Sequence, residues 1–121
     1  MTLVVPDAEN DMHAGDAQAI SRGDAWLHEH IDGYVRWAHR NKSLLILSCD
    51  RDDGTGNNHI PTLFVGPMVA RGVYSQRIDH YSVLRTILAM YGLAPLADSA
   101  TARPITEIWR SAPSVTASAR R

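Results

Sequence analysis

The apolar run Leu44–Leu47 limits the fold of this 121-residue chain more than any other feature. It has to be buried, and it is short, because the acidic segment Asp50–Asp53 follows it almost at once. Leucine also suits helices, so the residue types alone leave a helix and a strand open. The shortness of the run, and the Asp and Gly residues after it, favour a strand over Ser43–Cys49 that is buried on both faces. Strands of this kind are typical of sheets covered by helices.

The remaining patterned segments place helices and strands in alternation. Short strands are predicted at Thr2–Val5 and Pro61–Gly66, each ended by proline or glycine-proline. Apolar residues at helical spacing predict a helix from about Asp24 to Arg40 with Asp24 as N-cap, and a second helix capped by Asp79 and ended by Gly92. A strand–helix–strand unit with so long a connection is normally a parallel crossover. The fold class predicted is therefore α/β, a partial parallel sheet with flanking helices.

In such sheets, ligands bind beyond the carboxyl ends of the strands. The first predicted strand leads into the polar loop Asp7–Arg22, which contains His13, and the second leads into Asp50–Asp53. We therefore expect two acidic clusters at one edge of the sheet. His59 precedes the third strand, so it is expected to start from the opposite edge and to reach the site only if its loop folds back.

Clustered carboxylates beside histidines suggest a metal or phosphate site. Hard divalent cations take oxygen ligands, and two-metal hydrolases add histidine. The loop Asp50–Asp53 supplies three carboxylates at a strand end, His59 lies a few residues on, and His13 is expected beside this loop, so these residues are the candidates for such a site. An Asp-Asp-Gly segment also occurs as plain turn chemistry, and a histidine in a polar loop as ordinary surface, so both alternatives stay open at this point.

Composition excludes several classes of protein. Twelve basic and 13 acidic residues give a formal net charge of −1, which argues against nucleic-acid binding. The single cysteine, Cys49, excludes an intramolecular disulfide and a cysteine-built zinc finger. No apolar run approaches the ~20 residues of a membrane helix, and the N-terminus lacks a signal-peptide pattern, so a soluble chain of undetermined location is expected. Residues 111–121 are Ser, Ala, Thr and Arg in the main, which predicts a disordered tail after a segment spanning 1–110.

Several segments taken together resemble a known family: VVPDAENDMH, GDAWL, SLLILSCDRDDG, NNHIPTLFVGP, DHYSVLRT and MYGLAPL, in that order. They resemble the C-terminal part of the bacterial phosphoesterase family, which contains acid phosphatases and phospholipase C-like enzymes of alkaline-phosphatase-like α/β fold. The resemblance implies metal-assisted hydrolysis of phosphoric ester bonds in a small-molecule or lipid substrate. It also implies a family whose members are often exported from bacteria.

The resemblance assigns roles to particular residues. Asp50 matches the first of a pair of acidic metal ligands, His13 matches a histidine close to the phosphate, and His59 matches the histidine before an Ile-Pro-Thr strand. The second acidic position is Arg51 here, which reverses the local charge, so Asp52 is the candidate replacement ligand for the divalent cation. The family's nucleophile and early metal ligands belong to a region that precedes the resemblance. A C-terminal fragment, inactive alone, is therefore expected.

Two rival interpretations remain. In the first, the chain is a non-catalytic folded remnant or an interaction module that pairs with another chain through an exposed sheet edge. In the second it is an unrelated α/β phosphate- or metal-binding domain that shares only the carboxylates at the strand ends.

Overall fold

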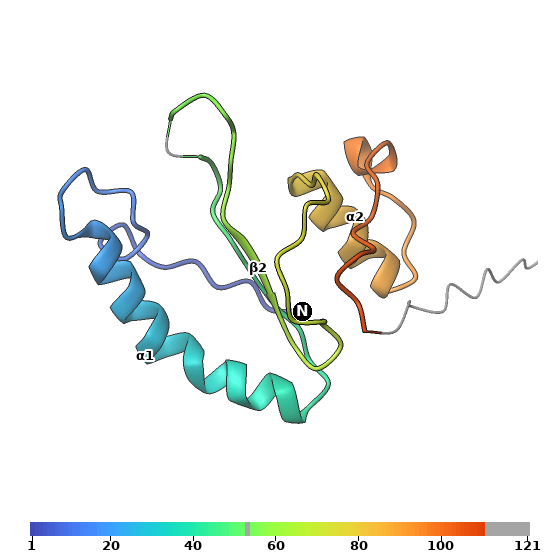
Figure 1. Ribbon diagram of the computed structural model, residues 1–121, viewed down its shortest axis with the longest axis horizontal. Helices are drawn as coiled ribbons and strands as arrows, with labels where there is room; N and C mark the ends of the chain where they lie inside the picture. The colour runs from blue at the N-terminus through green and yellow to red at the C-terminus, as the bar shows by residue number, and fades with distance from the viewer. Residues whose placement is uncertain (53, 111–121) are drawn as a thin grey trace, which may run out of the picture. The chain divides into compact units, whose positions relative to one another are not determined.

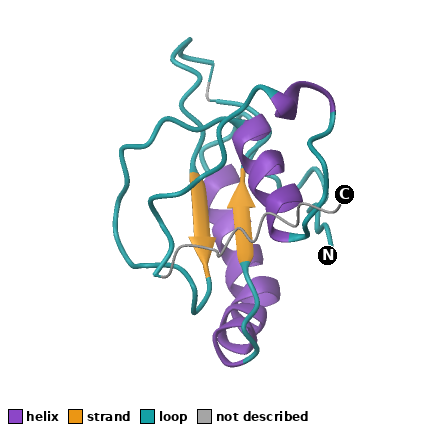
Figure 2. Cartoon of the chain, turned by 90° about the vertical axis from the view of Figure 1, so that its right-hand side faces the viewer, coloured by secondary structure: helices purple, strands orange, loops and turns teal. Residues whose placement is uncertain are grey.

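The computed structural model describes residues 1–52 and 54–110 (Figure 1). The chain divides into two compact units, Met1–Pro67 and Met68–Arg121, and each is described by itself. The first unit contains the helix α1 (Ala19–Arg40) and the strands β1 (Leu45–Ser48) and β2 (Thr62–Val65). The second contains the helix α2 (His80–Met90) and the short 3₁₀ helix η1 (Ala97–Ala100). Helices together with a partial sheet confirm the predicted α/β class (Figure 2).

The strands β1 and β2 pair antiparallel, from Leu45 opposite Val65 to Ser48 opposite Thr62. The predicted parallel arrangement is therefore not found in this sheet. A parallel pair needs a long crossover, usually a helix, whereas the connection between these two strands is an irregular polar loop that lets the chain turn straight back.

The predicted first strand, Thr2–Val5, is wrong: this segment is irregular and exposed. Alternating β-branched residues favour a strand only where a neighbouring strand supplies hydrogen bonds and an apolar face to cover. Both expectations failed for one reason. They required a strand before α1 to pair with β1, whereas β1 pairs with the strand that follows it.

The helix α1 begins at Ala19, earlier than the predicted start at Asp24. The cause lies in the preceding loop, where the Asp16 carboxylate accepts the backbone N–H of Gln18 at 2.8 Å and the Asp16 carbonyl accepts that of Ala19 at 3.2 Å. These bonds turn the chain into a helix before Asp24 is reached. Three residues of the predicted apolar stripe, Leu27, Ile31 and Val35, face the sheet, since they line a hollow of about 290 Å³ together with side chains of β1 and β2.

The ends of α2 agree with the prediction because both depend on local chemistry. The Asp79 carboxylate accepts the backbone N–H of Ser82 at 2.7 Å, as an N-cap does. Gly92 has a φ of +65°, and the Leu93 N–H reaches back to the Leu88 carbonyl at 2.9 Å. Glycine takes this left-handed conformation without steric cost, and so ends the helix.

The second unit is held together by a small core around Ile105 and Ile108, which are 3% and 5% exposed. The buried hydroxyl of Thr86 on α2 donates to the Ser82 carbonyl at 2.7 Å and accepts the Ile105 N–H at 2.8 Å. Trp109 closes the same turn by donating its indole N–H to the Ile105 carbonyl at 2.7 Å. The segment after η1 is thereby anchored on α2.

Among the described residues, none of the helices combines the length and apolar character needed to cross a membrane. The predicted disordered tail, 111–121, lies outside the described residues.

Candidate functional site

The loop that carries His13 is tied to the first turns of α1. The Arg22 guanidinium donates two hydrogen bonds to the Asp16 carboxylate, at 2.9 and 3.0 Å, and a third to the Glu9 carbonyl at 3.2 Å. The hydrogen bond from Arg22 lowers the pKa of Asp16, and the same contact raises the pKa of Arg22. Arg22 on α1 therefore holds the loop both at Glu9, before His13, and at Asp16, after it.

A close approach on α1 sets the position of the residues just before His13. Gly23 is buried, and a side-chain carbon there would clash with the side chain of Met12. Met12 itself has a φ of +65°, and the next N–H, that of His13, donates to the Asp11 carboxylate at 2.8 Å. Met12 packs against the bare helix backbone, which fixes where the chain emerges at His13.

The structure brings His13 to the loop that follows β1. A terminal nitrogen of Arg51 lies 3.1 Å from His13 Nε2 and 3.2 Å from Nδ1, across 38 positions of sequence. A guanidinium only donates, so His13 faces it with an unprotonated ring nitrogen. The Arg51 Nε lies 3.9 Å from the nearer Asp50 carboxylate oxygen. Arg51 therefore stands between the two predicted site residues His13 and Asp50.

Asp52 organises its own loop. One carboxylate oxygen accepts the Gly54 N–H at 3.1 Å, and the other accepts the Asn58 N–H at 2.8 Å. These bonds are turn chemistry of the kind that the sequence left open as an alternative. They also bend the loop so that it leads back into β2.

The antiparallel pairing changes the expected place of His59. In a hairpin the end of the first strand and the start of the second share one edge, so His59 lies at the same edge of the sheet as Asp50 and Arg51. At this edge the Ser48 and Thr62 hydroxyls are 3.0 Å apart, which holds the two strand ends together. The prediction of an opposite edge was wrong, and His59, which is exposed, lies on the same loop between β1 and β2 as Asp50 and Arg51.

The described residues do not fit a divalent cation as they stand. Within 1–52 and 54–110, no three His, Cys, Asp or Glu side chains come together in a way that could hold a metal ion. Both Asp52 oxygens are engaged by backbone N–H groups, and the Arg51 cation lies next to Asp50. The roles of Asp50 and Asp52 as ligands, and of His13 and His59 in catalysis, therefore stay predictions.

Comparison with known proteins decides the family. The model of the family described as "Phosphoesterase family" matches residues 1–94. The chain belongs to this family. It is 46% identical, over 109 residues, to a protein of Mycobacterium tuberculosis named phosphatidylinositol-3-phosphatase. The match covers 90% of this chain and 36% of that relative, so the chain spans about a third of the length of the relative. No solved structure matches the chain.

Two residues that hold the loop of His13 in place were not predicted from the sequence. Arg22 and Gly23 were assigned no role, although they hold the loop on which His13 lies. The spacing of six positions between Asp16 and Arg22 gives no signal, because side-chain pairs within a helix are three or four positions apart. Nothing in the sequence pattern indicates that Met12 packs on Gly23.

Proposed function

We propose that this chain serves in the hydrolysis of phosphoric ester bonds and that His13 and Arg51, with His59 from the same loop as Arg51, receive the phosphate of the substrate. One observation carries the proposal: the contact between His13 and Arg51 at 3.1 Å joins two segments that are far apart in sequence. Both segments lie within the part of the chain that the family model matches.

The two side chains have complementary properties for this task. The guanidinium of Arg51 is a permanent cation with five donors, and it binds two oxygens of a phosphate at once. Its side chain is 62% exposed, so an incoming phosphate has access to it. The imidazole of His13, once it has gained a proton, is placed to give that proton to the leaving oxygen of the ester.

The proposed substrate is a phosphorylated small molecule or lipid. The mycobacterial relative is named for the removal of phosphate from phosphatidylinositol 3-phosphate. A phosphomonoester on a lipid headgroup is therefore the first compound to test, beside p-nitrophenyl phosphate as a generic monoester.

We propose further that the chain alone does not hydrolyse esters, and that it acts together with a nucleophile from sequence that has no counterpart here. Two observations support this view. The chain spans about a third of the relative, and Arg51 stands where the family resemblance implies an acidic residue.

The experiment uses two proteins. The chain alone and its His13→Ala, Asp50→Ala double variant should release p-nitrophenol from p-nitrophenyl phosphate at the same background rate. A chimera of the mycobacterial relative, in which this chain replaces the segment that it matches, should be active. His13→Ala in the chimera should lower kcat by about 100-fold, as loss of a positioned proton donor does.

The control is Arg71→Gln in the chimera, which removes a cation from the second unit and should leave the rate unchanged. A folded chimera without activity, or one that His13→Ala leaves at full rate, contradicts the proposed function. A clear rate difference between the chain and its double variant contradicts the proposal that the chain is inactive alone.

A second candidate, an interaction module that associates through its sheet, has one observation in its favour. In the part of the chain that the structure describes, β1 and β2 form a two-stranded sheet, so each strand has an outer edge without a strand beside it. Sedimentation of the chain at several concentrations tests this, since association through these edges shifts the mass upward as concentration rises.

A further inference from the structure

The helix α1 carries aromatic side chains that neither the sheet nor the site at His13 uses. They recur every three or four positions and are called the aromatic stripe below: Trp26, His30, Tyr34 and Trp37. At 3.6 residues per turn they lie within about 80° around the helix axis and extend over about 16 Å along it. The side chains that face β1 and β2, such as Ile31, are centred about 100° further round, so the stripe is not the face that covers the sheet.

The rings of the stripe contact one another in two pairs. Trp26 and His30 stack with their ring centroids 4.7 Å apart and their planes 7° from parallel. Tyr34 and Trp37 meet with their centroids 5.5 Å apart and their planes tilted by 34°. Each pair is therefore gathered by direct contact, and the helical spacing places the two pairs end to end along α1.

The second pair is open to solvent. Tyr34 is 40% exposed and Trp37 is 49% exposed. A phenol and an indole each combine a large apolar ring with one hydrogen-bonding group. Such side chains are enriched at the boundary between lipid headgroups and acyl chains, because the ring enters the apolar layer while the O–H or N–H stays among the headgroups.

The same end of α1 is basic. Positions 33–49 include three Lys or Arg residues, Arg36, Arg40 and Lys42, and no Asp or Glu. Arg36 forms an ion pair with the preceding Asp32, whereas Arg40 and Lys42 follow the stripe and are exposed. A helix that presents aromatic and basic groups together is typical of proteins that lie on anionic membranes.

The end of α1 that carries Trp37 is fixed within the first unit. The Trp37 carbonyl accepts the backbone N–H of Asn41 at 3.0 Å and its side-chain N–H at 2.8 Å. Ala38, the next residue, is fully buried, and its carbonyl accepts the Ser43 N–H at 3.1 Å. Since this end of the helix does not have to be ordered on binding, docking on a surface costs less entropy.

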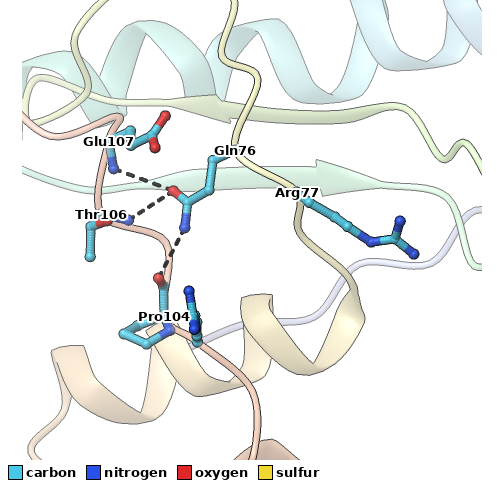
Figure 3. A pocket seen from close by; sticks show the side chains of 6 residues that line it. Gln76, Arg77, Pro104, Thr106 and Glu107 are labelled. Carbon is cyan, nitrogen blue, oxygen red and sulfur yellow. Dashed lines mark hydrogen bonds between the residues drawn. The ribbon is translucent and has the colours of Figure 1, made fainter.

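The second unit offers a matched exposed arginine outside the stripe. Gln76 donates its side-chain N–H to the Pro104 carbonyl at 3.2 Å and accepts the Thr106 N–H at 3.2 Å, while the Arg77 side chain extends away from these three residues (Figure 3). Arg77, which is exposed, is therefore a control for Arg40.

We propose that the aromatic stripe docks α1 on the surface of a lipid bilayer that contains anionic lipids. Tyr34 and Trp37 enter the boundary between headgroups and acyl chains, and Arg40 and Lys42 contact the lipid phosphates. The helix lies along the bilayer in this arrangement and does not cross it. The proposal extends the proposed function, since a bilayer presents a phosphorylated lipid substrate, but the docking itself requires no hydrolysis.

The test measures binding of the full chain to vesicles in a His13→Ala, Arg51→Gln background, so that the proposed phosphate site does not contribute. Vesicles of phosphatidylcholine mixed with phosphatidylglycerol supply negative charge without a phosphate monoester. We expect saturable co-sedimentation with these vesicles. It should weaken with vesicles of phosphatidylcholine alone and as the salt concentration rises, because salt screens the attraction of the basic side chains.

Variants separate the stripe from the rest of the surface. Trp37→Ala should weaken binding about tenfold, because an exposed indole no longer leaves water at the interface. Arg40→Gln should weaken it about fivefold, the effect of one basic residue near an anionic surface. Tyr91→Ala removes an aromatic side chain that is 61% exposed in the second unit, and neither it nor Arg77→Gln should change binding.

A second measurement locates the surface without any variant in the stripe. In bicelles that contain spin-labelled lipid, the Trp37 indole N–H should relax faster than that of Trp109, which donates to the Ile105 carbonyl at 2.7 Å.

Three results overturn the proposal in the chain itself: no binding to the anionic vesicles, Trp37→Ala bound as tightly as Tyr91→Ala, or equal relaxation of the Trp37 and Trp109 indoles. Binding that is lost in the chimera with the mycobacterial relative also overturns it, and assigns the stripe to an interface with the rest of that protein. Self-association that Trp37→Ala abolishes, without vesicle binding, assigns the stripe to a second copy of the chain. Vesicle binding by a chain whose chimera is inactive contradicts the proposed function and supports the docking surface.

Discussion

Arg51→Glu is the most direct test of how the loop after β1 handles charge. The wild-type Arg51 Nε lies 3.9 Å from an Asp50 carboxylate oxygen, and both side chains are largely in water, 62% and 89% exposed. The substitution replaces a cation by a carboxylate and so places two neighbouring acidic side chains at the end of the strand. We expect it to create affinity for a divalent cation such as Mn²⁺.

The magnitude follows from Coulomb's law in water, where two unit charges about 4 Å apart interact by about 1 kcal/mol. For a divalent ion at that distance from residue 51, removal of the Arg51 charge ends a repulsion of about 2 kcal/mol, and the new carboxylate adds an attraction of about 2 kcal/mol. Screening at a Debye length of about 8 Å reduces this sum to about 2 kcal/mol, which is a Kd about 30-fold lower.

Calorimetric titration with Mn²⁺ at physiological ionic strength measures the effect. Arg51→Gln removes the positive charge without adding a ligand, and should lower the Kd by about fivefold, which is half of the electrostatic effect. Arg71→Glu makes the same change of charge in the second unit and should do nothing. If Arg51→Glu binds Mn²⁺ no more tightly than Arg71→Glu, the loop after β1 is not a ligand site and the reasoning fails.

Three further predictions concern contacts within one or the other of the two units. Thr86→Val should lower the free energy of unfolding by about 2 kcal/mol and unprotect the Ile105 amide in hydrogen exchange, because the buried Ile105 N–H loses its acceptor; Thr86→Ser should keep that protection, and equal exchange in both variants would refute the role of the hydroxyl. Asp79→Ala should cost about 1 kcal/mol in denaturant unfolding, whereas Asp79→Asn keeps the cap. The hydrogen bond from the Ser82 N–H lowers the pKa of Asp79 below 3.8, so the stability that the Asp79 charge supplies is present above about pH 4 and is lost as the pH falls through the folded pKa. Asp79→Asn should abolish this part of the acid unfolding transition, and an unchanged transition would contradict the role of the Asp79 charge. Gly23→Ala should lower the free energy of unfolding by about 1–3 kcal/mol and shift the His13 ring resonances, since the new methyl clashes with Met12. Gly33→Ala, in open space on the same helix, should raise the free energy of unfolding by about 1 kcal/mol, and a Gly23→Ala variant more stable than Gly33→Ala would disprove the packing of Met12 on Gly23.

Local sequence chemistry predicted the elements whose ends depend on near neighbours. Asp79 and Gly92 bound α2 as expected, because a cap needs only a carboxylate three residues from an N–H and a residue that tolerates positive φ. The run of leucines became β1 for a similar reason, since its length and its flanking turn residues act within a few positions. Asp24 failed as a cap because Asp16, further upstream, had already started the helix.

The candidate site was predicted in its residues but not in its geometry. The residue types and the family resemblance predict His13, Asp50 and His59, and the expected meeting of two loops rests on parallel strands. The meeting of His13 with the loop after β1 is present, although the strands are antiparallel. It depends instead on Arg22 and Gly23, which hold the early loop on α1.

The sequence by itself determined the family, the α/β class and the residue types of the candidate site, because each of these follows from short patterns or from ordered segments. Only the tertiary structure decided the direction of β2, the shared edge of Asp50 and His59, and the contact of His13 with Arg51. Those features depend on which strand completes the backbone hydrogen bonds of β1 and on packing between residues 38 positions apart. The free energies that select one strand partner over another come from contacts between distant residues, which exist only in the folded chain.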